Sequence, residues 1–331
     1  MNEHDGGLPL PPSSRSGAGT RPRSAPVPEA TSVGATPRRR GAVAAYLALT
    51  KPRVMELLLL TTAPTMVLAG NGLPDPWRVG AVLVGGAASA GSAAVFNMYY
   101  DRDIDAVMVR TAKRPIVTGE VSPRAALVFA WSLAVFATLW FVAVVNVLSA
   151  ALSAAAIAWY VVVYTLVLKR RTAQNIVWGG LAGCFPVLIA WAAVTGAVGW
   201  PAVVLVVVVF LWTPAHYWPL SVRYSDDYRR AGVPMLGAVR SPAEVADGVL
   251  VYAVLTAVAA GVLVPVGALG PVYAVTVVVA GVWFIGHAVR YRAATRSPEP
   301  GDARPMRVFV ASNVYLAALF LAVAIDPLLR A

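Results

Sequence analysis

Long apolar segments recur along this sequence and are separated by short polar ones. Nine of them have close to the roughly 20 residues that an α-helix needs to cross a bilayer. Because an unpaired backbone polar group is costly in lipid, such segments cross as helices. The pattern therefore predicts an all-α polytopic membrane protein with nine transmembrane helices, at residues 54–71, 79–100, 123–144, 147–168, 175–195, 200–221, 244–265, 270–289 and 307–327.

The composition agrees with this pattern. Of the 331 residues, 58% are hydrophobic and 13% are charged, a balance that soluble domains of this size do not show. The single cysteine, Cys184, excludes an internal disulfide and a metal site built from thiolates. Residues 1–41 are instead rich in Pro, Ser, Gly, Arg and Ala. We expect a disordered cytoplasmic tail there, followed by the nine-helix domain at residues 42–331.

Basic residues distinguish the two sides of the membrane. The chain has 27 Lys and Arg residues, and all but Arg78 and Arg330 lie in the tail, at the entry to the first apolar segment or in alternate connections between the segments. The positive-inside rule then predicts a cytoplasmic N-terminus and an extracellular C-terminus. The net charge of +11 is explained by this topology, so no nucleic-acid partner is expected.

The stretch NMYYDRDIDAVMVRTAKRP, residues 97–115, places dense charge directly after an apolar segment. Asn97, Asp101 and Asp105 are four residues apart, so each step rotates only about 40° around a helix. One amide and two carboxylates therefore share a face at the cytoplasmic end of the second segment. Asp103 points elsewhere, and we expect it to be solvated or ion-paired.

A second cluster, HYWPLSVRYSDDYRRAGVPML, ends the sixth apolar segment on the same predicted side and contains Asp226 and Asp227. Two acidic clusters at equivalent helix ends can face one cavity. Mg²⁺ relieves the repulsion between such carboxylates and keeps positions for substrate phosphates. Arg110, Lys113 and Arg114 would bind the remaining phosphate oxygens. The two clusters together predict a site for magnesium and a diphosphate.

These residues resemble the UbiA superfamily of intramembrane prenyltransferases, which carries an N-x-x-x-D-x-x-x-D motif on one helix and a second acidic motif several helices later. Within that superfamily the chain looks like the actinobacterial members that farnesylate protohaem IX. The resemblance covers most of residues 50–240. The matching segments are TKPRVMELLLLTTAPTM, NMYYDRDIDAVMVRTAKRP, KRRTAQNIVWGGLAGC and DDYRRAGVPML.

The resemblance implies a UbiA-type bundle around a central cavity, in a bacterial cell membrane. It implies that farnesyl diphosphate and protohaem IX (haem B) react with water to give haem O and diphosphate, for haem A and cytochrome oxidase cofactor synthesis. The lipid bilayer and the next enzyme of haem A synthesis are the other expected partners. Carried over by position, Asn97, Asp101 and Asp105 would hold Mg²⁺ and the diphosphate, and Asp227, with Asp226 as the alternative, would hold a second metal from the opposite side. The substrates would be held by Arg110, Lys113, Arg114, His216, Arg223 and Tyr224.

The chain departs from the family's usual pattern at a few positions. It has WTPAHYW where WTPPHFW is usual, Ser225 in place of a Lys or Arg, and Gly237 in place of a proline. The loss of a base at position 225 removes one expected diphosphate contact. His216 has two possible roles, as a ligand of haem iron or as a hydrogen-bonding group near the diphosphate.

Three other functions compete with this interpretation. A related enzyme could attach a polyprenyl chain to a quinone precursor. A transporter or channel could bind ions with intramembrane acids, although transport sites usually lie near the bilayer midplane and these acids cluster at one face. A structural subunit of a respiratory assembly would not account for the face shared by Asn97, Asp101 and Asp105.

Overall fold

The computed structural model describes residues 40–52, 55, 60–297 and 303–330, so nearly all of the predicted tail lies outside it. Within these ranges every regular element is helical, and eight helices are long and apolar enough to cross a membrane. The chain is therefore a multi-pass membrane protein. The eight are α4 (Pro76–Tyr100), α6 with η1 (Pro123–Trp140, Phe141–Val145), α7 with η2 (Val147–Ala158, Trp159–Leu168), α8 with η3 and α9 (Asn175–Gly179, Gly180–Cys184, Phe185–Thr195), α10 (Trp200–Arg223), α13 (Pro242–Val266), α14 (Pro271–Ala294) and α15 (Pro305–Leu328).

The first predicted segment, residues 54–71, falls partly outside the described residues. Its described helix is α3 (Thr62–Gly70), which ends at Asn71 in the left-handed conformation. A short helix, α1 (Ala42–Leu49), precedes it. The other eight predicted segments agree with the eight spans within a few residues. Apolar length alone located them because it determines how far a helix can run through lipid.

Capping side chains determine where several of these helices begin. Asp75 accepts a hydrogen bond from the backbone N–H two residues later (3.0 Å), at the start of α4. Asn146 accepts one from the N–H three residues later (2.8 Å), at the start of α7. Ser241 and Glu244 form a capping box at the start of α13. Each cap satisfies a donor that has no partner within its helix.

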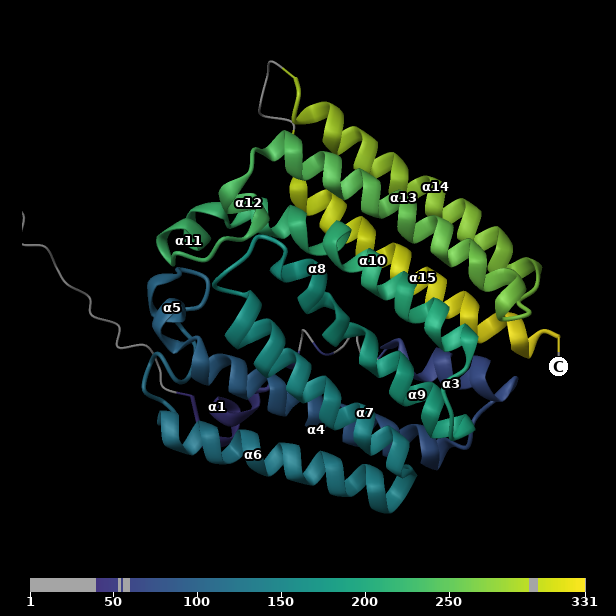
Figure 1. Cartoon of the computed structure of the whole chain (residues 1–331), viewed down its shortest axis with the longest axis horizontal. Coiled ribbons are helices and arrows are strands. Elements are labelled where there is room, and N and C mark those ends of the chain that lie inside the picture. Colours follow the sequence, from purple (N-terminus) through teal and green to yellow (C-terminus); the bar gives the residue numbers. More distant parts are fainter. Residues whose placement is uncertain (1–39, 53–54, 56–59, 298–302, 331) are drawn as a thin grey trace, which may run out of the picture. The chain divides into compact units, whose positions relative to one another are not determined.

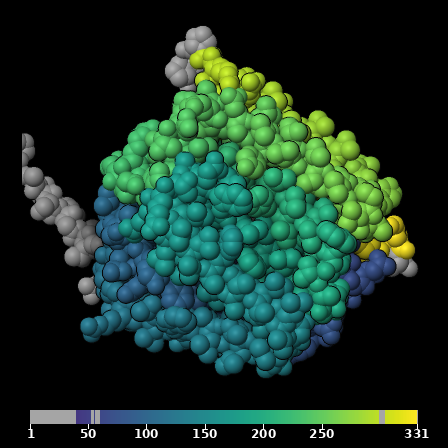
Figure 2. Space-filling model, in the orientation of Figure 1, coloured from purple at the N-terminus to yellow at the C-terminus, as the bar shows by residue number. Residues whose placement is uncertain are grey.

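The bundle is closed by contacts between helices far apart in the sequence (Figure 1). Helix α15 packs on α3 and α10 as well as on α14, and α3 packs on α9. The largest apolar cluster lies among α10 and α13 to α15, where Leu205, Phe284 and Leu319 are fully buried. In the space-filling view the segment from α7 to α10, in teal, covers the centre of one face (Figure 2). Apolar side chains such as Val279 on α14 are 64% exposed, which suits a surface in contact with lipid.

Three short helices lie together at one end of the bundle, where α4 and α10 both end (Figure 1). They are α5 (Arg102–Val107), α11 (Ser225–Arg230) and α12 (Leu236–Val239). The first contains part of one predicted acidic cluster, and the second contains the other. The fold therefore brings both clusters to the same end of the molecule, as the topology predicted.

Candidate active site at one end of the bundle

The first acidic cluster lies where α4 gives way to α5. Asp101 is the junction residue, and its N–H still bonds to the carbonyl of Asn97 (2.9 Å), so the helical course continues across it. Asn97, Asp101 and Asp105 are 3%, 0% and 2% exposed. By contrast, the side chain of Asp103 is 60% exposed. The three aligned residues thus share the buried side, and Asp103 faces outward, as their spacing predicts.

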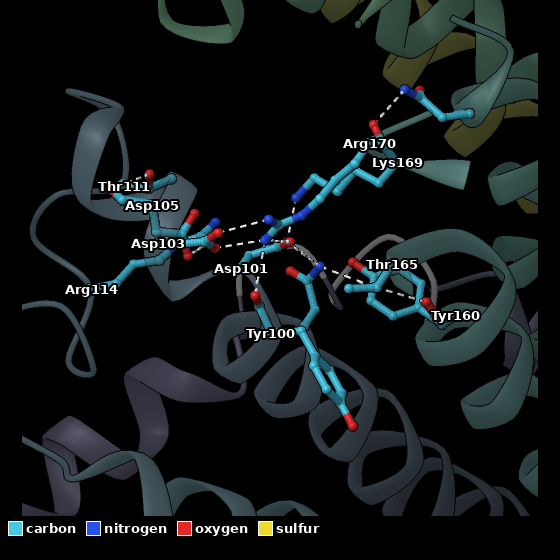
Figure 3. Close-up of polar contacts among 12 residues, drawn as sticks. Tyr100, Asp101, Asp103, Asp105, Thr111, Arg114, Tyr160, Thr165, Lys169 and Arg170 are labelled. Carbon is cyan, nitrogen blue, oxygen red and sulfur yellow. Dashed lines mark hydrogen bonds and ion pairs between the residues drawn. The ribbon is translucent and has the colours of Figure 1, made fainter. Parts of the chain in front are cut away.

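Each residue of the aligned trio contacts a cation. Lys51 donates to Asn97 Oδ1 (2.7 Å), Lys169 forms an ion pair with Asp101, and Arg114 forms one with Asp105. The Asn97 amide also donates to Asp101 Oδ2 (2.6 Å). Figure 3 shows Lys169 reaching Asp101 and Arg114 lying beside Asp105. The result is a buried network of three basic side chains, two carboxylates and an amide.

A wide helical turn positions Lys169. The span that ends in η2 is π-helical over Trp159–Leu168, and the Lys169 N–H bonds to the carbonyl of Tyr164 five residues earlier (2.8 Å). Thr165 lies on the same segment and accepts a hydrogen bond from the Asn97 amide (3.2 Å). π-Helical turns are rare and occur frequently at functional sites. Here the wide turn directs both Thr165 and Lys169 toward α4.

Arg170 covers the outer side of the network. It forms a two-pronged ion pair with Asp103 (2.6 and 2.7 Å), and its Nη2 lies 3.7 Å from Asp101 Oδ1. Because Arg170 donates to the carboxylate, the pKa of Asp103 is lowered to about 2. A cleft of about 290 Å³ opens here, lined by Tyr100, Arg102, Asp103, Thr165, Leu166 and Arg170.

The second acidic cluster separates into one buried and one exposed carboxylate. Asp227 accepts hydrogen bonds from the backbone N–H groups of Val109 and Arg110 (3.3 Å each) and pairs with Arg230. Its side chain is 8% exposed, whereas that of Asp226 is 78% exposed and pairs with an arginine at the surface. Asp227 therefore ties α11 to the loop after α5, and Asp226 lies apart from the network.

Aromatic side chains extend the site from Arg110. Its guanidinium donates to the hydroxyl of Tyr228 (3.2 Å), which in turn lies 2.8 Å from the hydroxyl of Tyr217. Arg110 and Arg223 both lie over the ring of Tyr224, at 5.4 and 5.7 Å from its centroid. The predicted substrate residues Arg110, Arg223 and Tyr224 thus form one group.

Two other predicted site residues lie outside these contacts. Lys113 is exposed, and its carbonyl accepts a hydrogen bond from Arg40 (3.5 Å). His216 lies on α10 with its ring against Trp212 and Phe309, and Ser312 is its hydrogen-bond partner. In the described structure it shares no hydrogen bond or ion pair with either acidic cluster.

Residues 58–324 match the model of the UbiA prenyltransferase family. The chain belongs to this family. It is therefore a membrane-embedded prenyl-transferring enzyme, and neither a transporter nor a purely structural subunit.

Several bacterial proteins are closely similar in sequence to this chain over most of its length. It is 58% identical to the protohaem IX farnesyltransferase of Pseudarthrobacter chlorophenolicus over 287 residues, which is 86% of this chain and 89% of the relative. It is also 58% identical to the protein of that name from Clavibacter michiganensis subsp. michiganensis, over 86% of this chain and 92% of the relative. The protein of that name from Tropheryma whipplei is 55% identical, over 86% and 94%.

Solved structures share the fold at low sequence identity. A digeranylgeranylglyceryl phosphate synthase aligns over 86% of this chain and 98% of its own, with a TM-score of 0.69 and 14% identity. A UbiA homologue from Archaeoglobus fulgidus, bound to DMAPP and Mg²⁺, aligns over 85% and 99%, with a TM-score of 0.56 and 17% identity. Both likenesses support the UbiA-type helical bundle.

Sequence reasoning gave no site role to Lys51 and Lys169 of the network or to Arg170 outside it, because it used them only as markers of topology and as parts of matching family segments. Burial lowers the pKa of Lys51 well below its usual value, and the nearby cations Arg114 and Lys169 lower it further. Charge balance could have revealed these residues. Two carboxylates held in a membrane protein need cationic partners, and the nearest candidates in the sequence are the Lys and Arg residues at neighbouring helix ends.

Proposed function

We propose that this chain transfers the farnesyl group of farnesyl diphosphate to a vinyl group of protohaem IX, with addition of water, to give haem O and diphosphate. The observation that carries the proposal is the 55–58% identity to protohaem IX farnesyltransferases over 86% of the chain. The basic, buried site at the end of the bundle suits an anionic diphosphate, and the apolar bundle suits a farnesyl chain and a porphyrin.

Breaking the allylic C–O bond puts negative charge on the diphosphate and positive charge on the farnesyl carbon. Lys169 and Arg114 already pair with the two carboxylates, and Lys51 donates to the amide. Arg110 and Arg223 lie over the ring of Tyr224. Cations held in place before the reaction stabilise the developing anion without reorganisation. Lys113 is exposed, so we expect it to attract the diphosphate at longer range.

Mg²⁺ is the metal that we propose for this site, with Asn97, Asp101 and Asp105 as its protein ligands. Among the described residues Asp101 Oδ1 is buried without a hydrogen-bond partner, so it is an oxygen ligand available to a hard cation. No group of three or more His, Cys, Asp or Glu side chains is close enough together to hold a metal within the described residues. Mg²⁺ commonly binds through one or two carboxylates plus substrate phosphates, so this donor set fits an ion that arrives with the diphosphate.

When bound, Mg²⁺ would supply charge neutralisation of the leaving diphosphate. A second metal at Asp227 stays a prediction. That carboxylate already accepts from two backbone N–H groups and Arg230, so its first role in our proposal is to fix the loop that carries Arg110. Asp226 is left as a surface residue.

The carbocation must meet the porphyrin vinyl group before it meets water. Tyr160 and Tyr164 on η2 have ring centroids 5.2 Å apart, and Tyr217 and Tyr228 are hydrogen-bonded to each other. An aromatic face stabilises a nearby cation by roughly 0.5 to 2 kcal/mol. We therefore propose that these tyrosines form the wall along which the farnesyl cation moves away from the diphosphate.

We propose a bacterial cell membrane location with the diphosphate site and the N-terminus in the cytoplasm and the C-terminus outside. Residues 1–41 would form a tail and residues 42–331 the catalytic domain, which could transfer haem O to the next enzyme of haem A synthesis.

Cys184 is the only cysteine and is 1% exposed, so cysteines introduced at the surface can be labelled selectively to test this topology. Thr118→Cys should react with an impermeant maleimide only after cell lysis, and Ala197→Cys in intact cells; the reverse pattern would invert the topology.

The test of activity uses membranes that contain the protein, protohaem IX, farnesyl diphosphate and Mg²⁺, with and without EDTA. We expect haem O, identified by mass-resolved chromatography, and its loss when EDTA is present. Membranes with the Asp101→Ala variant are the control for endogenous activity. Prenylation of a quinone precursor in place of protohaem would assign the chain to the other branch of the family.

A further inference from the structure

His216 on α10 is held in a sandwich between two aromatic rings. Its ring centroid lies 4.2 Å from that of Trp212 and 4.4 Å from that of Phe309 on α15, with interplanar angles of 15° and 30°. His216 Nδ1 lies 2.9 Å from the hydroxyl oxygen of Ser312. These contacts fix both the plane of the imidazole and its rotation within that plane.

The position of the protons follows from a second contact of Ser312. Its hydroxyl oxygen lies 2.7 Å from the carbonyl oxygen of Phe309, which can only accept. The single hydroxyl proton must therefore point to that carbonyl, since two facing oxygen lone pairs would repel at this distance. The hydroxyl is then an acceptor toward His216, so Nδ1 carries a proton. In a neutral imidazole this leaves the lone pair on Nε2.

Nε2 is the ring nitrogen of His216 that is available to bind a ligand. It makes no hydrogen bond to another side chain in the described part of the chain, and it is not among the enclosed polar atoms that lack a partner. Ser312 is fully buried, whereas His216 is partly accessible. Because the two nitrogens lie on opposite sides of the ring, Nε2 points away from α15. It therefore presents an unprotonated nitrogen to accessible space.

We propose that Nε2 of His216 is an axial ligand of the iron of the porphyrin substrate, and that Ser312 is the positioning residue that keeps Nδ1 protonated. This inference rests on the proposed function. A neutral imidazole commonly ligates haem iron. Metal-binding histidines almost always donate their other N–H to an oxygen acceptor, which fixes their orientation. Here that acceptor is in place in the free protein, and coordination releases no proton because Nε2 carries none.

Iron ligation would place the porphyrin at the α10 wall, away from the diphosphate network. Tyr217, the next residue on α10, is hydrogen-bonded to Tyr228, which is bonded to Arg110. One helical segment would thus connect the porphyrin iron to the aromatic side of the diphosphate site. This arrangement gives the porphyrin a fixed orientation before its vinyl group meets the farnesyl cation.

The experiment measures binding of ferric protohaem IX to the full-length protein in lipid nanodiscs, without farnesyl diphosphate, by absorption and electron paramagnetic resonance. We expect the spectrum of histidine-bound iron for the unchanged protein, and its loss in His216→Gly. Millimolar imidazole should restore it in that variant. Ser312→Ala should weaken binding about 10-fold, the lower limit for loss of such a supporting partner. His287→Ala, which changes a histidine outside this contact, is the control and should leave the spectrum unchanged.

Three outcomes would contradict the inference in distinguishable ways. Spectra of His216→Gly and of the folded, near-isosteric His216→Gln that match the unchanged protein would overturn the iron ligation. Unchanged affinity in Ser312→Ala would overturn the positioning role of Ser312. A protein that binds no protohaem but prenylates a quinone precursor would overturn the proposed function itself.

Discussion

The ion pair between Lys169 and Asp101 offers a quantitative test of the site. Asp101 is fully buried, and the side chain of Lys169 is 11% exposed. The change Lys169→Met keeps most of the side-chain volume and removes the charge. Of the groups in the described part of the chain, Asp101 would then keep the Asn97 amide as its one hydrogen-bond donor, at 2.6 Å, and Arg170 at 3.7 Å from its other oxygen.

Two effects determine the size of the loss. Leaving a buried charge without its ion-pair partner costs roughly 3 to 5 kcal/mol. A unit charge 3.7 Å away would return about 4.5 kcal/mol at an effective dielectric constant of ~20. Arg170 is 39% exposed and already bound to Asp103, however, so solvent screening reduces this stabilisation. We expect Lys169→Met to lower the free energy of unfolding by about 3 kcal/mol.

The assay is reversible unfolding in mixed detergent and SDS micelles, followed by circular dichroism. The double variant Asp101→Asn with Lys169→Met removes both charges and should return to within about 1 kcal/mol of the unchanged protein. Arg229→Met is the matched control, because it breaks the exposed pair with Asp226 (2.7 Å) and an exposed hydrogen bond to the Ala238 carbonyl (3.0 Å), and should cost about 1 kcal/mol. Equal losses in Lys169→Met and Arg229→Met would refute the reasoning.

Three further predictions follow from the described contacts. Asp101→Ala and Asp105→Ala should abolish haem O formation, whereas Asp103→Ala, which changes an exposed residue, should leave at least about a tenth of it; equal loss in all three would contradict the buried-face assignment. Gly237→Ala should destabilise the protein by about 1 to 3 kcal/mol, since the added Cβ would lie 2.5 Å from the Val222 nitrogen. Gly261→Ala, with open space around it, is the control, and equal unfolding curves for the two variants would count against the close contact. Asp326→Ala removes the acceptor for the N–H groups of Gly270 (2.5 Å) and Tyr273 (3.1 Å) at the start of α14. We expect it to lower the unfolding free energy by about 2 kcal/mol, and equal denaturation midpoints for the variant and the unchanged protein would disprove this.

The structure also accounts for one departure from the family pattern. Gly237 stands where a proline is usual, and its N–H donates to the hydroxyl of Ser221 (3.1 Å). A proline would remove this donor, and its Cβ would collide with the backbone of Ser221 and Val222. The glycine is therefore required by the close approach of α12 to the end of α10. For Ser225 the described contacts provide no corresponding explanation.

The sequence by itself determined the spans and the alignment of the acids. Apolar runs near the length of a bilayer located eight helices, because lipid requires every backbone group in a span to bond within its own helix. The four-residue spacing of Asn97, Asp101 and Asp105 was sufficient to predict their common face, since helical rotation is a local property. Family resemblance rested on the same local motifs.

Only the tertiary structure decided which charges meet. Asp226 and Asp227 are adjacent in the sequence, yet one is exposed and the other binds the backbone of a loop that is 117 residues away. Lys51 and Lys169 contact the acidic network from two segments other than α4 and α5. Lys169 does so because of a π-helical turn that the residue pattern did not predict. The reason is physical: spacing along one helix fixes a face, whereas the partner of a buried charge depends on how separate helices pack.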